Sequence, residues 1–242
     1  MEALTLCVPP TPGHSIVRRP NNGSIFSIAD IVRQKNYTPY FIYGGDGYFD
    51  NMNTFFGGQG FTIIDRNRGN PLSDDIKTKR INIDDNEVQF ENAWGISDED
   101  IYNKALKNAD ADFKQNKRFF NFIMTTSNHK PYTFPANKID MPTGSRDAAV
   151  KYTDYALGKF IEKAKTKQPT IEILNIKLQQ DFSANTNTKQ QSLQRYVIFV
   201  KDLKAFSKSR NSLVLFAMVD MPHLLKLIIK HKSFNFIKIR FY

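Results

Sequence analysis

Cysteine is nearly absent from the sequence, and long apolar runs are missing altogether. Cys7 is the only cysteine among 242 residues, which excludes a disulfide bond within the chain. No apolar run reaches the ~18 residues that a membrane-spanning helix needs. Met1 leads directly into a mixed, proline-containing segment, which is not the pattern of a secretory signal peptide. We therefore expect neither a signal peptide nor a transmembrane segment in this chain.

Glycine is missing from the end of the sequence. All 12 glycines lie at or before Gly158, whereas average usage would place about five in residues 168–242. The same stretch has 12 Lys/Arg against 4 Asp/Glu, so +8 of the net charge of +10 belongs to it. We predict a boundary near residue 168, between a folded part (2–167) and a divergent basic tail (168–242) that does not integrate into the fold. Within the tail, strands are conceivable at 196–200 and 213–219, and a basic amphipathic helix or strand at 223–238.

The first 167 residues alternate between helix-like and strand-like patterns. A serine cap followed by three acidic residues at Ser97–Asp100 predicts the start of a helix. Short β-branched and aromatic runs such as YTPYFIY at 37–43 predict buried strands. Alternation of helices and strands is typical of an α/β fold with helices on both faces of a sheet. We expect helices at 24–36, 49–56, 97–115 and 148–167, strands at 37–43, 61–65 and 119–125, and an irregular surface excursion at 66–92.

Two turns follow predicted strands and should therefore share one edge of the sheet. Gly44–Asp46 follows the strand at 37–43, and Asn128–His129 follows the strand at 119–125. In a parallel sheet the carboxyl ends of the strands meet on one side, where ligands bind. We expect a turn with free N–H groups and an imidazole to face the same space, which would suit a phosphate-sized ligand.

Several sequence blocks occur in a specific order and together span about two thirds of the chain. They are EALT (2–5) with PPTPG (9–13), TPYFIYGGDGYFDNMNTFF (38–56), FTIIDRN (61–67), NAWGISDEDIYNKAL (92–106), FIMTTSNHKPYTFP (122–135) and KYTDYALGKFI (151–161). In this combination they resemble the lipoteichoic acid synthase-like family of phosphoglycerol transferases. That family has a catalytic domain of the alkaline-phosphatase and sulfatase type.

The resemblance implies both a fold and an activity. The fold would be a partial alkaline-phosphatase/sulfatase-like sheet. The activity would be that of a transferase or hydrolase acting on phosphoglycerol groups of a membrane lipid or envelope glycan. In the family a threonine attacks phosphorus, and a divalent metal (Mn, Mg or Zn) lowers the pKa of the nucleophile and offsets developing charge. The family's catalytic domain lies outside the cytoplasmic membrane, in the periplasm or the extracellular space.

The sequence departs from the family pattern at the catalytic residues. The family's nucleophilic threonine precedes the segment that matches Glu2-Ala3, so it falls outside this sequence. An Asp-His metal-ligand pair should follow the helix that ends near Lys167, but no Asp-His dipeptide occurs there. We therefore expect a fragment with no catalytic residue, no bound metal and no activity on its own.

The resemblance also points to substrate-binding residues. His129, beside Asn128, matches a family histidine that contacts the phosphoglycerol; alternatively it ties down a loop by hydrogen bonds. Asp46 matches an acidic rim residue, or is a turn aspartate that satisfies its own backbone. Asn51 aligns with a substrate-gripping stretch, or caps a helix. Trp94 is interpreted as a packing residue in preference to a ligand.

Other classes of function remain open. The tail interleaves lysines with aromatic residues, a pattern that can bind nucleic acid or other anionic polymers without catalysis. The same composition also arises in out-of-frame translation of A/T-rich DNA, or in a divergent extension. A catalytically dead relative that binds glycerophosphate polymers is a further alternative.

Overall fold

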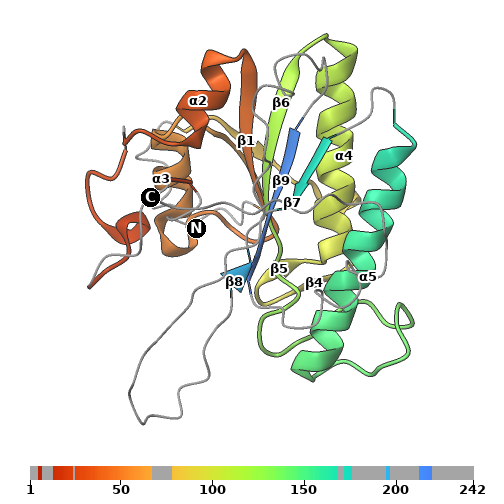
Figure 1. Ribbon diagram of the computed structural model, residues 1–242. Helices are drawn as coiled ribbons and strands as arrows, with labels where there is room; N and C mark the ends of the chain where they lie inside the picture. The colour runs from red at the N-terminus through yellow and green to blue at the C-terminus, as the bar shows by residue number, and fades with distance from the viewer. Residues whose placement is uncertain are drawn as a thin grey trace, which may run out of the picture.

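A computed structural model describes residues 5–6, 13–23, 25–66 and 78–167 of the chain, together with the backbone of three strands at 172–175, 195–196 and 213–219. Its centre is a mainly parallel sheet in the order β3-β2-β1-β6-β9-β7, with β8 antiparallel to β9 (Figure 1). The α/β fold class is therefore confirmed. The strands are β1 (Tyr37–Tyr43), β2 (Thr62–Asp65), β3 (Arg80–Asn82), β6 (Arg118–Met124), β7 (Glu172–Asn175), β8 (Arg195–Tyr196) and β9 (Leu213–Val219).

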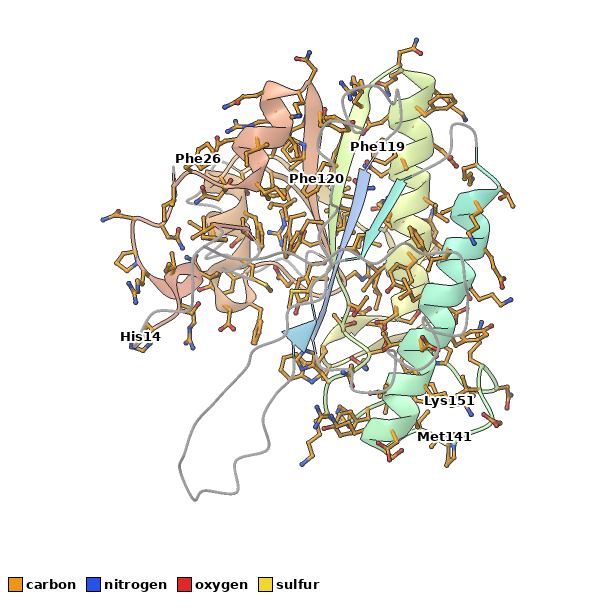
Figure 2. The ribbon with its side chains drawn as sticks, viewed as in Figure 1. His14, Phe26, Phe119, Phe120, Met141 and Lys151 are labelled. Atoms are coloured by element: carbon orange, nitrogen blue, oxygen red, sulfur yellow. The ribbon has the colours of Figure 1, made fainter. Side chains whose placement is uncertain are left out.

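Helices cover both faces of this sheet. The short helices α2 (Ile28–Gln34) and α3 (Met52–Gly58) lie on one side of β1 and β6, and the long helices α4 (Asp98–Lys114) and α5 (Arg146–Lys165) lie on the other (Figure 1). Each face has its own apolar core. Phe119 and Phe120, neighbours on β6, belong to opposite cores, as expected where successive strand side chains alternate (Figure 2).

Strands β1 and β6 form the middle of the sheet and position the rim. They pair in parallel over their whole length, from Tyr37 opposite Arg118 to Tyr43 opposite Met124. Both are apolar almost throughout because they are covered on two faces. Pro39 is tolerated in β1, since β2 pairs with β1 only over Tyr40–Ile42.

The predicted elements before residue 168 are present, with ends that differ by a few residues. The helix expected at 49–56 is divided into a 3-10 turn, η2 (Phe49–Asn51), and α3. The stretch at 66–92 is more regular than expected. It contains β3, the 3-10 turn η4 (Asp85–Glu87) and β4 (Glu91–Asn92), which pairs with β5 (Gly95–Ile96) as a two-stranded hairpin.

Two strands beyond residue 167 extend the sheet. β9 lies parallel to β6, with Phe120 opposite Leu213, and β7 lies parallel to β9. The expectation that the tail does not join the fold is therefore wrong for these backbones, and the strand expected at 213–219 is confirmed. The physical reason is that β6 would otherwise present a row of unpaired N–H and C=O groups.

The assignment of 168–242 as a separate unit stays a prediction. The expectations for 197–200 and for 223–238 lie outside the described residues. None of the helices in the described part of the chain combines the length and apolarity needed to cross a bilayer.

Candidate functional site

The candidate site lies where β1 and β6 end. Because the two strands are adjacent and parallel, the loops that follow them (44–51 and 125–133) leave the sheet on the same side. This side is the lower edge of the sheet in Figure 1, where the β4–β5 hairpin also lies. The prediction that the two turns share one rim is confirmed, whereas the ligand role of their residues stays a prediction.

Three rings from three separate segments form a row on this rim. The indole of Trp94, in the β4–β5 hairpin, stacks on the imidazole of His129 with ring centroids 4.5 Å apart and planes at 21°. The ring of Phe49, in the loop after β1, meets the same indole edge to face at 5.5 Å. This aromatic row (Phe49, Trp94, His129) connects the two loops through the hairpin.

Hydrogen bonds join the hairpin to the loop after β6. The indole N–H of Trp94 donates to the carbonyl oxygen of Lys130 at 2.5 Å. The side-chain amide of Asn92 donates to the carbonyl and the hydroxyl oxygen of Thr133, at 3.2 and 3.0 Å. On the other side, the backbone N–H of Ile96 donates to the carbonyl of Gly44 at 2.9 Å. The hairpin therefore holds both loops.

Glycine is required where the hairpin meets the loop after β1. Gly95 has φ +137°, and a Cβ on it would lie 2.2 Å from the carbonyl oxygen of Gly44. A Cβ on Gly45 would lie 2.5 Å from the carbonyl oxygen of Trp94. Two backbones thus approach too closely for any side chain.

Asp98, at the start of α4, anchors the loop after β6. One oxygen of its buried carboxylate accepts the backbone N–H groups of Thr126 (3.2 Å) and Ser127 (2.9 Å). Burial raises the pKa of Asp98, while these hydrogen bonds and the Thr153 side chain oppose the rise. The sequence predicts Asp98 only as an acidic residue in the first turn of a helix, because its hydrogen-bond partners lie about 29 positions away.

His129 is half-buried beside this anchor. Its backbone N–H donates to the carbonyl of Thr126 at 3.1 Å, which closes the turn. Burial lowers the pKa of the imidazole, and the negative charge of Asp98 partly offsets that effect. The ring is therefore neutral at pH 7, with one N–H donor and one acceptor nitrogen. Asn128, the preceding residue, is also half-buried.

Asp46 lies on the same rim, but its carboxylate has partners there. One oxygen accepts the backbone N–H of Tyr48 at 3.0 Å and a guanidinium N–H of Arg80 at 2.6 Å. Arg80 also forms a bidentate pair with the fully buried Asp65, at 2.7 and 2.6 Å. The pKa of Asp65 is raised by burial, against the effect of Arg80.

The expected free N–H groups of the turn are engaged within it. The N–H of Gly47 donates to Asp65 at 2.6 Å, that of Tyr48 to Asp46, and that of Phe49 to the carbonyl of Asp46 at 3.0 Å. For these three groups the expectation is wrong, because the carboxylates of Asp65 and Asp46 and the carbonyl of Asp46 accept their hydrogen bonds. Arg80 forms the centre of this network. The sequence gives no signal for it, because it lies in the stretch at 66–92 that is expected to be irregular.

Asn51 has a left-handed backbone, with φ 61°, and follows Asp50 at φ 53°. Its side-chain amide donates to the carbonyl of Val17 at 3.1 Å. Asn51 occupies the N-cap position of α3, yet its side chain makes no capping hydrogen bond. The residue thus ties the loop after β1 to the N-terminal segment.

The described residues do not fit a metal ion. Within 5–6, 13–23, 25–66 and 78–167, no three His, Cys, Asp or Glu side chains are grouped so that they could hold one. The acidic pair at the rim, Asp46 and Asp65, is bridged by the guanidinium of Arg80.

The parallel sheet flanked by helices on both faces places the chain in the α/β class, and comparison with known proteins identifies the family. The chain belongs to the Sulfatase family, which matches residues 6–174. It thereby falls in the alkaline phosphatase superfamily, and the resemblance inferred from the sequence blocks is confirmed.

Two solved structures are similar to the chain. One is a protein of the alkaline phosphatase superfamily from Vibrio parahaemolyticus, with 39% identity and a TM-score of 0.58 over 69% of this chain. The other is the lipoteichoic acid synthase LtaP from Listeria monocytogenes, with 25% identity and a TM-score of 0.52 over 67% of this chain. The match covers 38% of each of those two chains.

Proposed function

We propose that this rim holds the phosphoglycerol group of a membrane lipid or envelope glycan, as part of a metal-dependent transferase or hydrolase of the Sulfatase family. The observation that carries the proposal is the position of His129. Its imidazole is half-buried, stacked on Trp94 and placed on the carboxyl edge of a parallel sheet, next to the loop after β1. The similarity to a lipoteichoic acid synthase supports the choice of phosphoglycerol among phosphoesters.

His129 would act as the hydrogen-bond donor to a phosphoryl oxygen. A neutral imidazole donates through one nitrogen, and a dianionic or monoanionic phosphate favours protonation of the other. Asn128 would supply an amide to the phosphate, and Asn51 and Asp46 would face the glycerol hydroxyls. Since Arg80 holds the carboxylate of Asp46, this carboxylate would orient the loop and also accept a hydrogen bond from a glycerol hydroxyl.

The proposed setting follows the family. The divalent metal and the attacking threonine would complete the reaction in an intact enzyme outside the cytoplasmic membrane. The described residues do not group to hold a metal. We expect no turnover of a glycerophosphate-headgroup lipid by this chain, with or without added manganese or magnesium.

Binding of glycerol phosphate to the full chain tests the proposal. His129→Gln should weaken binding about tenfold or more, since a hydrogen bond to a charged group is worth roughly 1.5–3 kcal/mol. His14→Gln is the matched control, because His14 is exposed and is drawn at the outer edge of the molecule in Figure 2. Isothermal titration or NMR titration gives the dissociation constants. Equal affinities for wild type and His129→Gln would contradict the proposal.

A further inference from the structure

Trp94 makes two different contacts with the loop that carries His129. Its ring stacks on the imidazole at 4.5 Å, and its indole N–H donates to the carbonyl of Lys130, the next residue. No other residue type combines a flat two-ring face with a donor at that reach. The single tryptophan of the chain therefore touches both the ring and the backbone of the histidine's turn.

The tryptophan is itself fixed by its hairpin. The backbone N–H of Trp94 donates to the side-chain oxygen of Asn92 at 2.8 Å, and the amide of Asn92 reaches Thr133. The adjacent Gly95 allows the hairpin to lie directly on Gly44. As a result, the backbone of Trp94 is held in place, and the indole forms a platform beside the ring of His129.

We propose that Trp94 is a positioning residue that fixes the ring orientation of His129 and thereby connects the loop after β1 with the loop after β6. This inference rests on the proposed function in one respect only: the orientation matters because His129 contacts the ligand. Phe49 contacts the same indole edge to face. A shift of the loop after β1 would therefore change the packing around the indole.

The stacked arrangement makes the protonation of His129 measurable. An imidazolium in contact with an indole quenches the indole fluorescence, so protonation of His129 is reported by Trp94. Because the chain has one tryptophan, the whole tryptophan emission comes from this site. The charged group that acts on the imidazole is Asp98 of α4; Trp94 from the hairpin is uncharged.

The first experiment needs no ligand. Tryptophan emission of the full chain is recorded from about pH 8 down to about pH 4, because an ordinary histidine titrates near 6.5 and burial lowers the pKa of His129. We expect emission to fall as the pH falls, with one transition that His129→Gln abolishes and His14→Gln leaves unchanged. A transition that persists in His129→Gln, or no transition in wild type, would overturn the positioning role.

The second experiment uses glycerol phosphate and a double-mutant cycle. Trp94→Leu removes the platform and should weaken binding at least about fivefold, while Trp94→Phe keeps a stacking ring and should lie between. In Trp94→Leu/His129→Gln the loss should be no greater than in His129→Gln alone, because the platform acts only through the imidazole. Thermal unfolding of each variant verifies that it is folded.

The outcomes separate the two proposals. Fully additive losses, or wild-type affinity in folded Trp94→Leu, would overturn the role of Trp94 and leave the proposed function intact. A His129-dependent emission change in a wild-type chain that does not bind glycerol phosphate would support the positioning of His129 and overturn the proposed function.

Discussion

His129 is a residue whose ionisation is coupled to folding. Burial lowers the pKa of the imidazole in the folded chain, with Asp98 partly opposing the shift, whereas the unfolded chain has an ordinary histidine near ~6.5. As the pH falls through that value, the unfolded state binds its proton first. The folded state therefore loses stability relative to the unfolded state, until the pH is below the folded-state pKa.

This sign gives a prediction for the acid side of the stability profile. Between pH 7 and pH 5, wild type should lose more stability than His129→Gln, because glutamine does not titrate. Urea unfolding midpoints at pH 7, 6 and 5 measure the difference, and the other titrating groups cancel between the two proteins. Parallel profiles would mean that the imidazole is as solvated in the folded chain as in the unfolded one.

Removal of the Arg80 side chain should lower the stability of the fold strongly. This side chain neutralises Asp65, which has no exposed surface, and it also holds Asp46 at the rim. Arg80→Met would leave a buried carboxylate unpaired, and we expect a loss of about 3–5 kcal/mol at pH 7. The loss should shrink at pH 5, since a buried carboxyl without its partner takes up a proton.

Arg18→Met serves as the control for Arg80→Met. Arg18 pairs with Asp50 at 3.5 Å and both side chains are largely solvated, so its loss should stay within about 0.5 kcal/mol. Urea unfolding of both variants at the two pH values gives the comparison. Similar small losses for both would show that the buried network is not needed to keep Asp65 in the core.

Among the elements, the β4–β5 hairpin contributes most to the site for its size. Its few residues contact both rim loops, through Trp94 on one side and Gly95 on the other. Gly95→Ala should therefore disturb the rim beyond its own position. A side chain at φ +137° is strained, and its Cβ would clash with the Gly44 carbonyl, so we expect a loss of at least about 2 kcal/mol.

Gly158→Ala provides the matched change for Gly95→Ala. Gly158 lies within α5, a Cβ there meets nothing within 4 Å, and alanine is the better helix former. This variant should be neutral or more stable by up to about 1 kcal/mol. Thermal unfolding and the Trp94 emission spectrum are the two measurements. An unchanged spectrum in Gly95→Ala would show that the hairpin does not depend on its contact with Gly44.

The elements differ in how far the sequence predicts them. β1, β6, α4 and α5 carry a continuous apolar run or a clear helical stripe, and the sequence locates them. β3 and the β4–β5 hairpin are two or three residues per strand, too short for any periodicity to be visible. They exist because distant partners pair with them, so only the three-dimensional arrangement reveals them.

In the site, too, the sequence predicts some features and not others. That His129 and Asp46 share a rim follows from two strands being adjacent and parallel. The stacking of Trp94 on His129 joins residues 35 positions apart, and the Arg80–Asp46 pair joins residues 34 apart. No local pattern encodes such pairs, so the sequence predicts Trp94 only as a packing residue and gives no signal for Arg80.

At the scale of the whole molecule, the sheet has two cores that meet at β1 and β6. Stacked rings fill one core, where Phe41 and Phe56 lie 3.7 Å apart, and the α4–α5 pair seals the other. On the far side of β6 the sheet continues through β9 to β7. The composition of the chain changes at residue 168, yet its hydrogen-bonded sheet does not end there.

A proline in β9 distinguishes an integrated strand from a separate tail. Leu215 pairs with Phe122 of β6 on one side and with Leu174 of β7 on the other. Proline has no N–H to donate and is excluded from central strands, so Leu215→Pro should destabilise the chain by about 2 kcal/mol or more. Leu215→Val keeps the donor and a high strand propensity, and it should change stability by less than about 1 kcal/mol. Hydrogen exchange at the amides of β6, together with urea unfolding, measures both effects. If Leu215→Pro unfolds like wild type and β6 remains equally protected, the tail is a separate unit and the folded part ends near residue 167.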